Sequence, residues 1–149
     1  MRARIYVCHT FYHVYVACLK ELNLPKEERG KADMVLSNMS CDFGNLSGRL
    51  VASGLFGKVF IFEEQEESRV PGLAKYHKDR GNIVLNMLAR MVFCKKLGAA
   101  QEAYVPVDFR QYRDIYVFCD SDPIGYYLSW KKIHYHAMED GLDCIRYYD

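Results

Sequence analysis

Residues 4–22, RIYVCHTFYHVYVACLKEL, change their hydrophobic period once, at His9-Thr10. Before that point, the run from Ile5 to Cys8 is β-branched, aromatic or apolar throughout, as in a buried strand. After it, large side chains return at the spacing of a helix, and Thr10 stands where an N-cap is expected. The large side chains on this helical face are Phe11, Tyr15, Cys18 and Leu22. The segment therefore predicts a strand, a tight turn and a helix.

The same alternation continues along the chain. Further strands are expected at residues 32–37, 58–62, 114–119 and 132–138, and further helices at 45–53, 82–96 and 123–130. The nearly apolar third strand suggests a parallel sheet covered on both faces, and the Ile, Leu and Met content of 82–96 suggests a core helix. The charged residues 63–80 predict a long surface excursion that is functional or partly helical. The pattern predicts an α/β fold: a Rossmann-like, doubly wound, mostly parallel sheet with helices on both faces.

Composition narrows the class of protein. The chain of 149 residues has the size of one domain, and 50% of its residues are hydrophobic, which excludes general disorder. A formal net charge of +1 gives no reason to expect nucleic acid as a partner. The six cysteines form no C-x-x-C pair and mostly lie in apolar runs, so we expect buried, reduced thiols in the cytoplasm. No apolar run is long enough for a spanning helix, and contact with a membrane surface stays open.

In a doubly wound sheet, ligands bind at the carboxyl ends of the strands. The residues expected at that edge are 9–13, 37–45, 63–67, 120–122 and 139–141. The glycine-rich turn of dinucleotide-binding proteins and the P-loop are both missing from the sequence, which disfavours classical NAD binding and NTP hydrolysis.

Two patterns suggest a metal ion, each with a simpler alternative. Asp120 and Asp122 follow the fourth strand and could hold Mg²⁺ or Mn²⁺ through their carboxylates, although Asp122 also stands where a helix cap is expected. His134 and His136 would share one face of the fifth strand at a spacing that can chelate zinc, but no third ligand stands at a suitable spacing.

Two other sets of residues are candidates for substrate chemistry. At the first turn, Thr10 and His13 can offer backbone amides and an imidazole to an anionic or sugar ligand, or be ordinary first-turn residues. Near the end of the chain, Glu139-Asp140-Gly141 follows the last strand, and Gly141 permits a sharp turn. Asp140 could act there as a general base toward a substrate hydroxyl, whereas the simpler alternative is a turn of two acids and a glycine.

The opening RIYVCHTFYHVYVACLKEL and the segment YHAMEDGL at residues 135–142 resemble bacterial sialyltransferases of lipooligosaccharide and capsular polysaccharide synthesis, and their polysialyltransferase relatives. The resemblance implies the GT-B arrangement of two Rossmann-type domains. It implies metal-independent, inverting transfer of sialic acid from CMP-sialic acid to a sugar hydroxyl. It also implies that Asp140 is the catalytic base, with Glu139 and Gly141 completing the motif. The family's first turn usually has Thr-Pro on the acceptor side, and here Thr10 and His13 occupy that turn without the proline.

The resemblance covers the whole chain but only the N-terminal, acceptor-side half of such an enzyme, because the His-Pro motif of the donor domain does not occur here. Residues 1–149 are thus expected to be that single domain, cytoplasmic and weakly active alone. The expected partners are a CMP-sugar donor and a glycan acceptor, with no cofactor; peripheral membrane contact and a homodimer stay open.

Two rival functions remain at this point. One is a metal-dependent glycosyltransferase that uses Asp120 and Asp122. The other is a non-catalytic α/β binding module that presents an aromatic surface to a partner or glycan. The residues of that surface would be Tyr12, Tyr15, Tyr126, Tyr127 and Trp130.

Overall fold

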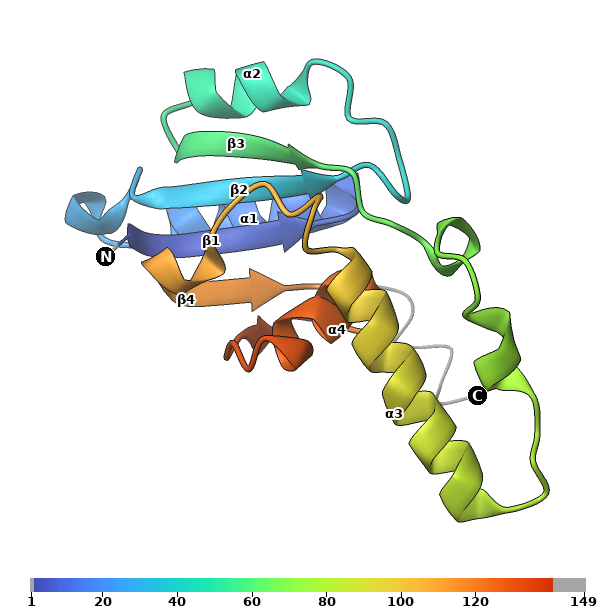
Figure 1. Ribbon diagram of the computed structural model, residues 1–149. Helices are drawn as coiled ribbons and strands as arrows, with labels where there is room; N and C mark the ends of the chain where they lie inside the picture. Colours follow the sequence, from blue (N-terminus) through green and yellow to red (C-terminus); the bar gives the residue numbers. More distant parts are fainter. Residues whose placement is uncertain (1, 141–149) are drawn as a thin grey trace, which may run out of the picture.

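The computed structural model describes residues 2–140. In this part of the chain, five strands form a sheet in the order β3-β2-β1-β4-β5, and every neighbouring pair is parallel (Figure 1). The strands are β1 (Arg2–Cys8), β2 (Ala32–Ser37), β3 (Phe56–Phe62), β4 (Tyr112–Val117) and β5 (His136–Ala137). The helices are α1 (Phe11–Leu22), α2 (Leu46–Ala52), α3 (Ile83–Ala100) and α4 (Pro123–Trp130). The expected α/β fold with a Rossmann-like parallel sheet is confirmed.

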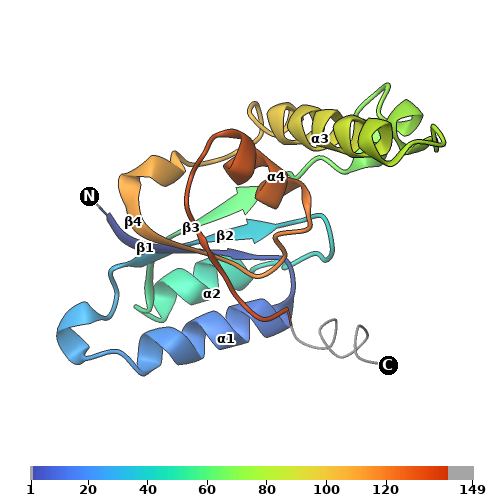
Figure 2. The same ribbon diagram turned by 90° about the horizontal axis from the view of Figure 1, so that it is seen from below.

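Two cores lie on opposite faces of the sheet. Because side chains alternate along a strand, Ile5 and Val7 of β1 enter one core, and Tyr6 and Cys8 enter the other. The helix α4 covers the first core, whereas α1 and α2 cover the second (Figure 2). Parallel strands need such crossover helices, so the covered faces follow from the alternation of strand and helix in the sequence.

The two edge strands differ from the sequence expectation. The apolar run at 58–62 predicted burial on both faces, but β3 lies at the edge of the sheet, and only its end residues Phe56 and Phe62 are buried. At the other edge, β5 consists of two exposed residues instead of the longer strand expected at 132–138. Strand order depends on pairing between distant segments, which local hydrophobicity does not report.

The helix α1 has the predicted bounds but turns a different face inward. Phe11 and Tyr15, from the face of large side chains, are more than half exposed. The buried residues of α1 are His13, Val14, Ala17 and Glu21. The Glu21 carboxylate accepts hydrogen bonds from Arg4 Nε at 2.8 Å and from the Tyr6 hydroxyl at 2.7 Å. A buried ion pair with β1 therefore helps to decide which face of α1 meets the sheet.

The helix α3 departs most from expectation, because it is not a core helix. It begins at Ile83, ends at Ala100 and extends past the carboxyl ends of the strands (Figures 1 and 2). One side contacts α4 and the short helix η3 (Ala74–His77), mainly through Phe93 and Leu97. Gly98 permits this close approach, since a Cβ there would lie 2.6 Å from the carbonyl oxygen of Tyr126. The opposite side of α3 is exposed.

Two expectations from the sequence concerned the state of the cysteines and the presence of a membrane-spanning helix. The five cysteines within residues 2–140 are free thiols, as predicted, but only Cys8 is fully buried. Cys144 lies outside the described residues. No helix in residues 2–140 is long and apolar enough to cross a membrane.

Candidate active site

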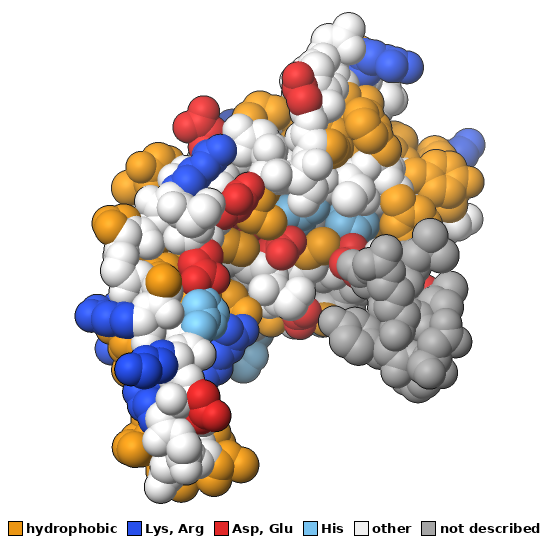
Figure 3. Space-filling model, turned by 90° about the vertical axis from the view of Figure 1, so that its right-hand side faces the viewer, with side chains coloured by type: hydrophobic (Ala, Val, Ile, Leu, Met, Phe, Trp, Pro, Cys, Tyr) orange, Lys and Arg blue, Asp and Glu red, His pale blue; other side chains and the backbone are white. Residues whose placement is uncertain are grey.

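Six side chains that can ionise meet at the carboxyl edge of the sheet and form what we term the edge cluster. Figure 3 looks onto this edge, where histidine and acidic side chains lie side by side. The cluster consists of His9, His13, Glu64, Cys119, Asp122 and Asp140. They follow β1, β3, β4 and β5 or begin α4, and His13 is in the first turn of α1. Several of the segments selected from the sequence for this edge therefore supply a continuous polar cluster.

Glu64 is the buried centre of the edge cluster, and its side chain has 0% exposure. Its Oε2 accepts hydrogen bonds from His9 Nε2 at 2.5 Å and Ser37 Oγ at 2.6 Å, and its Oε1 accepts one from the Ile124 backbone N–H at 2.7 Å. The last bond satisfies an N–H in the first turn of α4, where the N-cap residue Asp122 makes no side-chain cap. Glu64 thus connects the ends of β1 and β2 to the start of α4.

His9 and Glu64 form a buried charge pair. Burial lowers the pKa of His9, but the hydrogen bond that His9 donates to Glu64 and the nearby Asp122 carboxylate, 3.6 Å from His9 Nε2, leave that pKa above its ordinary 6.5. Its Nδ1 is the buried side-chain polar atom that has no hydrogen-bond partner within residues 2–140. The surroundings of His9 therefore favour its protonated form.

Hydrogen bonds fix His13 at both ring nitrogens. Its Nδ1 accepts the backbone N–H of His9 at 3.0 Å and of Thr10 at 3.3 Å. The Thr10 hydroxyl accepts the N–H of His13 in return, which completes a capping box at the start of α1. With Nδ1 as an acceptor, the neutral ring carries its proton on Nε2, which donates to Asp140 Oδ1 at 2.5 Å. Burial lowers the pKa of His13 more than Asp140 raises it, which favours this neutral form.

The Asp140 carboxylate is held at one oxygen by hydrogen bonds from within residues 2–140. Its Oδ1 accepts from His13 Nε2 and from Cys119 Sγ, the latter at 3.1 Å, whereas its Oδ2 has no protein donor within residues 2–140. The Asp140 side chain is 28% exposed. Burial, together with Asp140, raises the pKa of the Cys119 thiol, so it stays a hydrogen-bond donor. A carboxylate fixed in this way can accept a proton from a hydroxyl that reaches Oδ2.

The remaining predicted substrate residues have other positions. Thr10 caps α1 with its side chain, so its hydroxyl is engaged within the turn. Glu139 is exposed beside Asp140. Gly141 lies outside the described residues, and its expected turn stays a prediction.

The two predicted metal pairs are not formed. Asp120 is exposed and lies 3.5 Å from the Tyr135 hydroxyl, whereas Asp122 faces His9, so the two carboxylates have separate partners. His134 is exposed and precedes β5, and His136, on β5, is exposed as well. Neither pair belongs to a converging group of metal ligands in the part of the chain that the structure describes.

A different set of potential metal ligands does converge. His9, His13 and Cys119 each place one ligand atom within 4.8 Å of those of the other two. Imidazole and thiolate are the ligands that zinc prefers. However, both His Nε2 atoms are hydrogen-bonded to carboxylates, and the raised pKa of Cys119 opposes loss of its proton. A zinc ion bound to His13 Nε2 would have to replace the hydrogen bond to Asp140, whereas His9 has an Nδ1 without a hydrogen-bond partner in residues 2–140.

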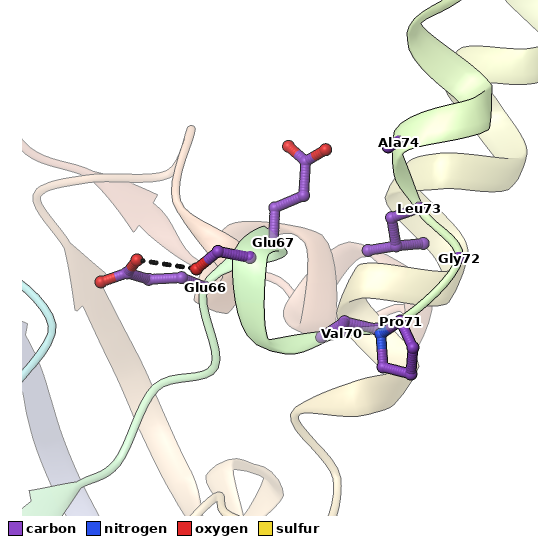
Figure 4. A pocket seen from close by; sticks show the side chains of 8 residues that line it. Glu66, Glu67, Val70, Pro71, Gly72, Leu73 and Ala74 are labelled. Atoms are coloured by element: carbon purple, nitrogen blue, oxygen red, sulfur yellow. Dashed lines mark hydrogen bonds between the residues drawn. The ribbon is translucent and has the colours of Figure 1, made fainter.

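Two surface hollows lie near this side of the molecule. The larger, of about 600 Å³, is lined by one continuous segment from Glu66 to Ala74, in which the side chains of Glu66 and Glu67 point in different directions (Figure 4). The smaller, of about 240 Å³, adjoins the edge cluster and includes Asp122 and Tyr126 in its wall. This smaller hollow is open to solvent, so the edge cluster borders an open surface.

The aromatic residues expected for a binding module do not form one surface. Tyr12 and Tyr15 are exposed on α1, whereas Tyr127 of α4 is buried in the core on the other face of the sheet. Trp130 packs against that same core, and Tyr126 contacts Phe93 of α3.

Sequence reasoning did not single out His9 or Glu64. Both lie within segments expected at the carboxyl edge, and this position is the one signal that points to them. Glu64 is one of four glutamates between residues 63 and 67, and nothing local distinguishes the buried one from its neighbours.

Comparison with protein-family models, with curated proteins and with solved structures finds no match.

Proposed function

We propose that this chain is the acceptor-side domain of an inverting, metal-independent, sialyltransferase-like glycosyltransferase of the GT-B type, with Asp140 as general base. The observation that carries the proposal is the arrangement of the Asp140 carboxylate. His13 and Cys119 hold Oδ1, while Oδ2 has no donor within residues 2–140 and is the oxygen proposed to accept the proton. The sequence resemblance of residues 135–142 to the acid-acid-glycine motif supports the same residue.

In the proposed reaction, an acceptor sugar hydroxyl gives its proton to Asp140 Oδ2 while its oxygen attacks the anomeric carbon of the donor sugar. The bond from that carbon to the phosphate oxygen of CMP breaks, and CMP leaves with the electron pair. Neutral His13 donates from Nε2 to Oδ1 and orients the carboxylate. Sialic acid is the proposed sugar, and the acceptor is a glycan of surface polysaccharide or lipooligosaccharide.

The position of the edge cluster supports a transferase domain of this kind. Ligands of open parallel sheets bind outside the carboxyl ends of the strands, and Asp140 lies just beyond the carboxyl end of β5. The open surface beside Asp122 suits a glycan that is covered only when a donor-binding domain faces it.

The test is release of CMP from CMP-sialic acid by the intact gene product, with a galactose-terminated acceptor. We expect release to need the acceptor, to survive EDTA, and to fall by about 10²- to 10⁴-fold in Asp140→Asn. Glu63→Gln is the matched control, because it removes an exposed carboxylate that follows β3 at the same edge of the sheet. Loss of activity with EDTA together with full activity of Asp140→Asn would refute the proposal in favour of metal-dependent transfer.

A further inference from the structure

The exposed side of α3 is a hydrophobic stripe on a helix that projects from the domain. Its six side chains recur at the spacing of one helix face over three turns, opposite the side that contacts α4 and η3. The stripe consists of Ile83, Val84, Met87, Leu88, Met91 and Val92, with exposed fractions from 41% to 76%. Single exposed apolar residues are common on protein surfaces. A continuous stripe of them marks a surface that a membrane or another molecule covers.

The segment that carries the stripe is also strongly basic. Residues 69–96, hereafter the arm, contain seven Lys and Arg side chains and one acid, Asp79, which gives a formal charge of +6. Figure 3 shows Lys and Arg side chains beside hydrophobic ones over the arm, at the lower left. The basic residues are Arg69, Lys75, Lys78, Arg80, Arg90, Lys95 and Lys96.

These cations have no acidic partners in the described chain. None of the seven forms an ion pair within residues 2–140. Arg90 donates to the Tyr126 hydroxyl and lies over the Phe93 ring, and Arg80 donates to backbone carbonyls. Their charge is therefore available to an anionic surface.

We propose that the arm docks on an anionic lipid bilayer, with the α3 stripe inserted among the acyl chains and the basic residues against the headgroups. An apolar helix face beside Lys and Arg is the combination that binds the membrane interface. Charge disfavours a second copy of the chain as the partner, because two copies of the arm placed face to face would bring +6 against +6. Nucleic acid would leave the apolar stripe exposed. This inference is independent of the proposed transferase activity.

Flotation with lipid vesicles tests the proposal on the whole chain. We expect binding to vesicles of phosphatidylglycerol and phosphatidylethanolamine, and little binding to pure phosphatidylcholine. The double variant Met87→Ser/Met91→Ser should reduce the partition coefficient about tenfold or more. Lys78→Glu/Lys95→Glu should reduce it at least about fivefold per position, and added salt should weaken binding of the wild type.

A matched control keeps the result interpretable. Leu19→Ser/Val51→Ser removes two apolar side chains that are also exposed but lie on α1 and α2, away from the arm, and should float as the wild type does. Sedimentation of the same proteins without lipid reports their oligomeric state. Concentration-dependent dimers that the Met87→Ser/Met91→Ser variant loses would overturn the proposal in favour of a self-interface. Absence of flotation with either lipid mixture would also overturn it.

Discussion

Replacing Glu64 by Gln should destabilise the protein strongly, because it removes the charge at the centre of a buried network. Glu64 is fully buried and accepts three hydrogen bonds, from His9, Ser37 and the N–H of Ile124. A glutamine of nearly the same volume keeps one carbonyl acceptor but presents an N–H₂ group to the remaining donors. Removal of one partner of a buried charge pair costs about 3–5 kcal/mol, a large share of a total stability of about 5–15 kcal/mol.

The free energy of unfolding lost in Glu64→Gln should depend on pH, because His9 changes its protonation with pH. The folded protein holds the pKa of His9 above 6.5, so it binds that proton more tightly than the unfolded chain does. The stability that the protonated His9 contributes to the folded protein is fully present below pH 6.5 and is lost as the pH rises through the folded pKa of His9. Since Glu64→Gln removes the main cause of the raised pKa, the free-energy difference from the wild type should be larger near about pH 6 than near about pH 8.5.

Urea unfolding followed by the fluorescence of Trp130, the single tryptophan, gives these free energies. The control is Glu67→Gln, because Glu67 also lies 2.5 Å from a histidine, His77, but both side chains are well exposed. Exposed pairs contribute about 0–1 kcal/mol, so this variant should change little. If Glu64→Gln costs no more than Glu67→Gln at the lower pH, the reasoning about buried charge is wrong.

Three further predictions concern the helix contact, His13 and metal ions. Gly98→Ala should lower the free energy of unfolding by about 1–3 kcal/mol, because the added Cβ would lie 2.6 Å from the Tyr126 carbonyl oxygen. Gly48→Ala in α2, where no atom lies within 4 Å of the added Cβ, should raise it by up to about 1 kcal/mol. Equal urea midpoints for the two variants would contradict this. Burial lowers the pKa of His13 below 6.5, so the folded form loses stability as the pH falls. In the same urea assay, the wild type should therefore exceed His13→Gln in free energy of unfolding by less at pH ~5 than at pH ~7. A difference that grows toward pH ~5 would contradict this. Zinc should inhibit CMP release by displacing hydrogen bonds of the edge cluster, with Cys119→Ser less sensitive, and activation by zinc would contradict this.

Part of the candidate site follows from the sequence, because topology places the ends of parallel strands at one edge. Asp140 and His13 were identified in this way, although 127 residues separate them and nothing in the sequence pairs their side chains. His9 and Glu64, 55 residues apart, lie in segments expected at this edge but were not predicted as site residues. For Glu64 the reason is that a buried glutamate and an exposed one have the same local sequence pattern. The aspartate and histidine metal pairs were predicted from spacing alone, and spacing does not report which way a side chain points.

The sequence by itself determined the order and type of the elements. Periods of two and of about 3.6 residues, with Thr10 and Pro123 at helix starts, locate β1, β2, α1 and α4 within a few residues, since these signals are local. The tertiary structure alone decided which strands lie at the edges, which face of α1 is buried, and that the apolar α3 lies outside the core. Those outcomes depend on contacts between distant segments, such as Glu21 with Arg4 and Gly98 with Tyr126, and no local period encodes them.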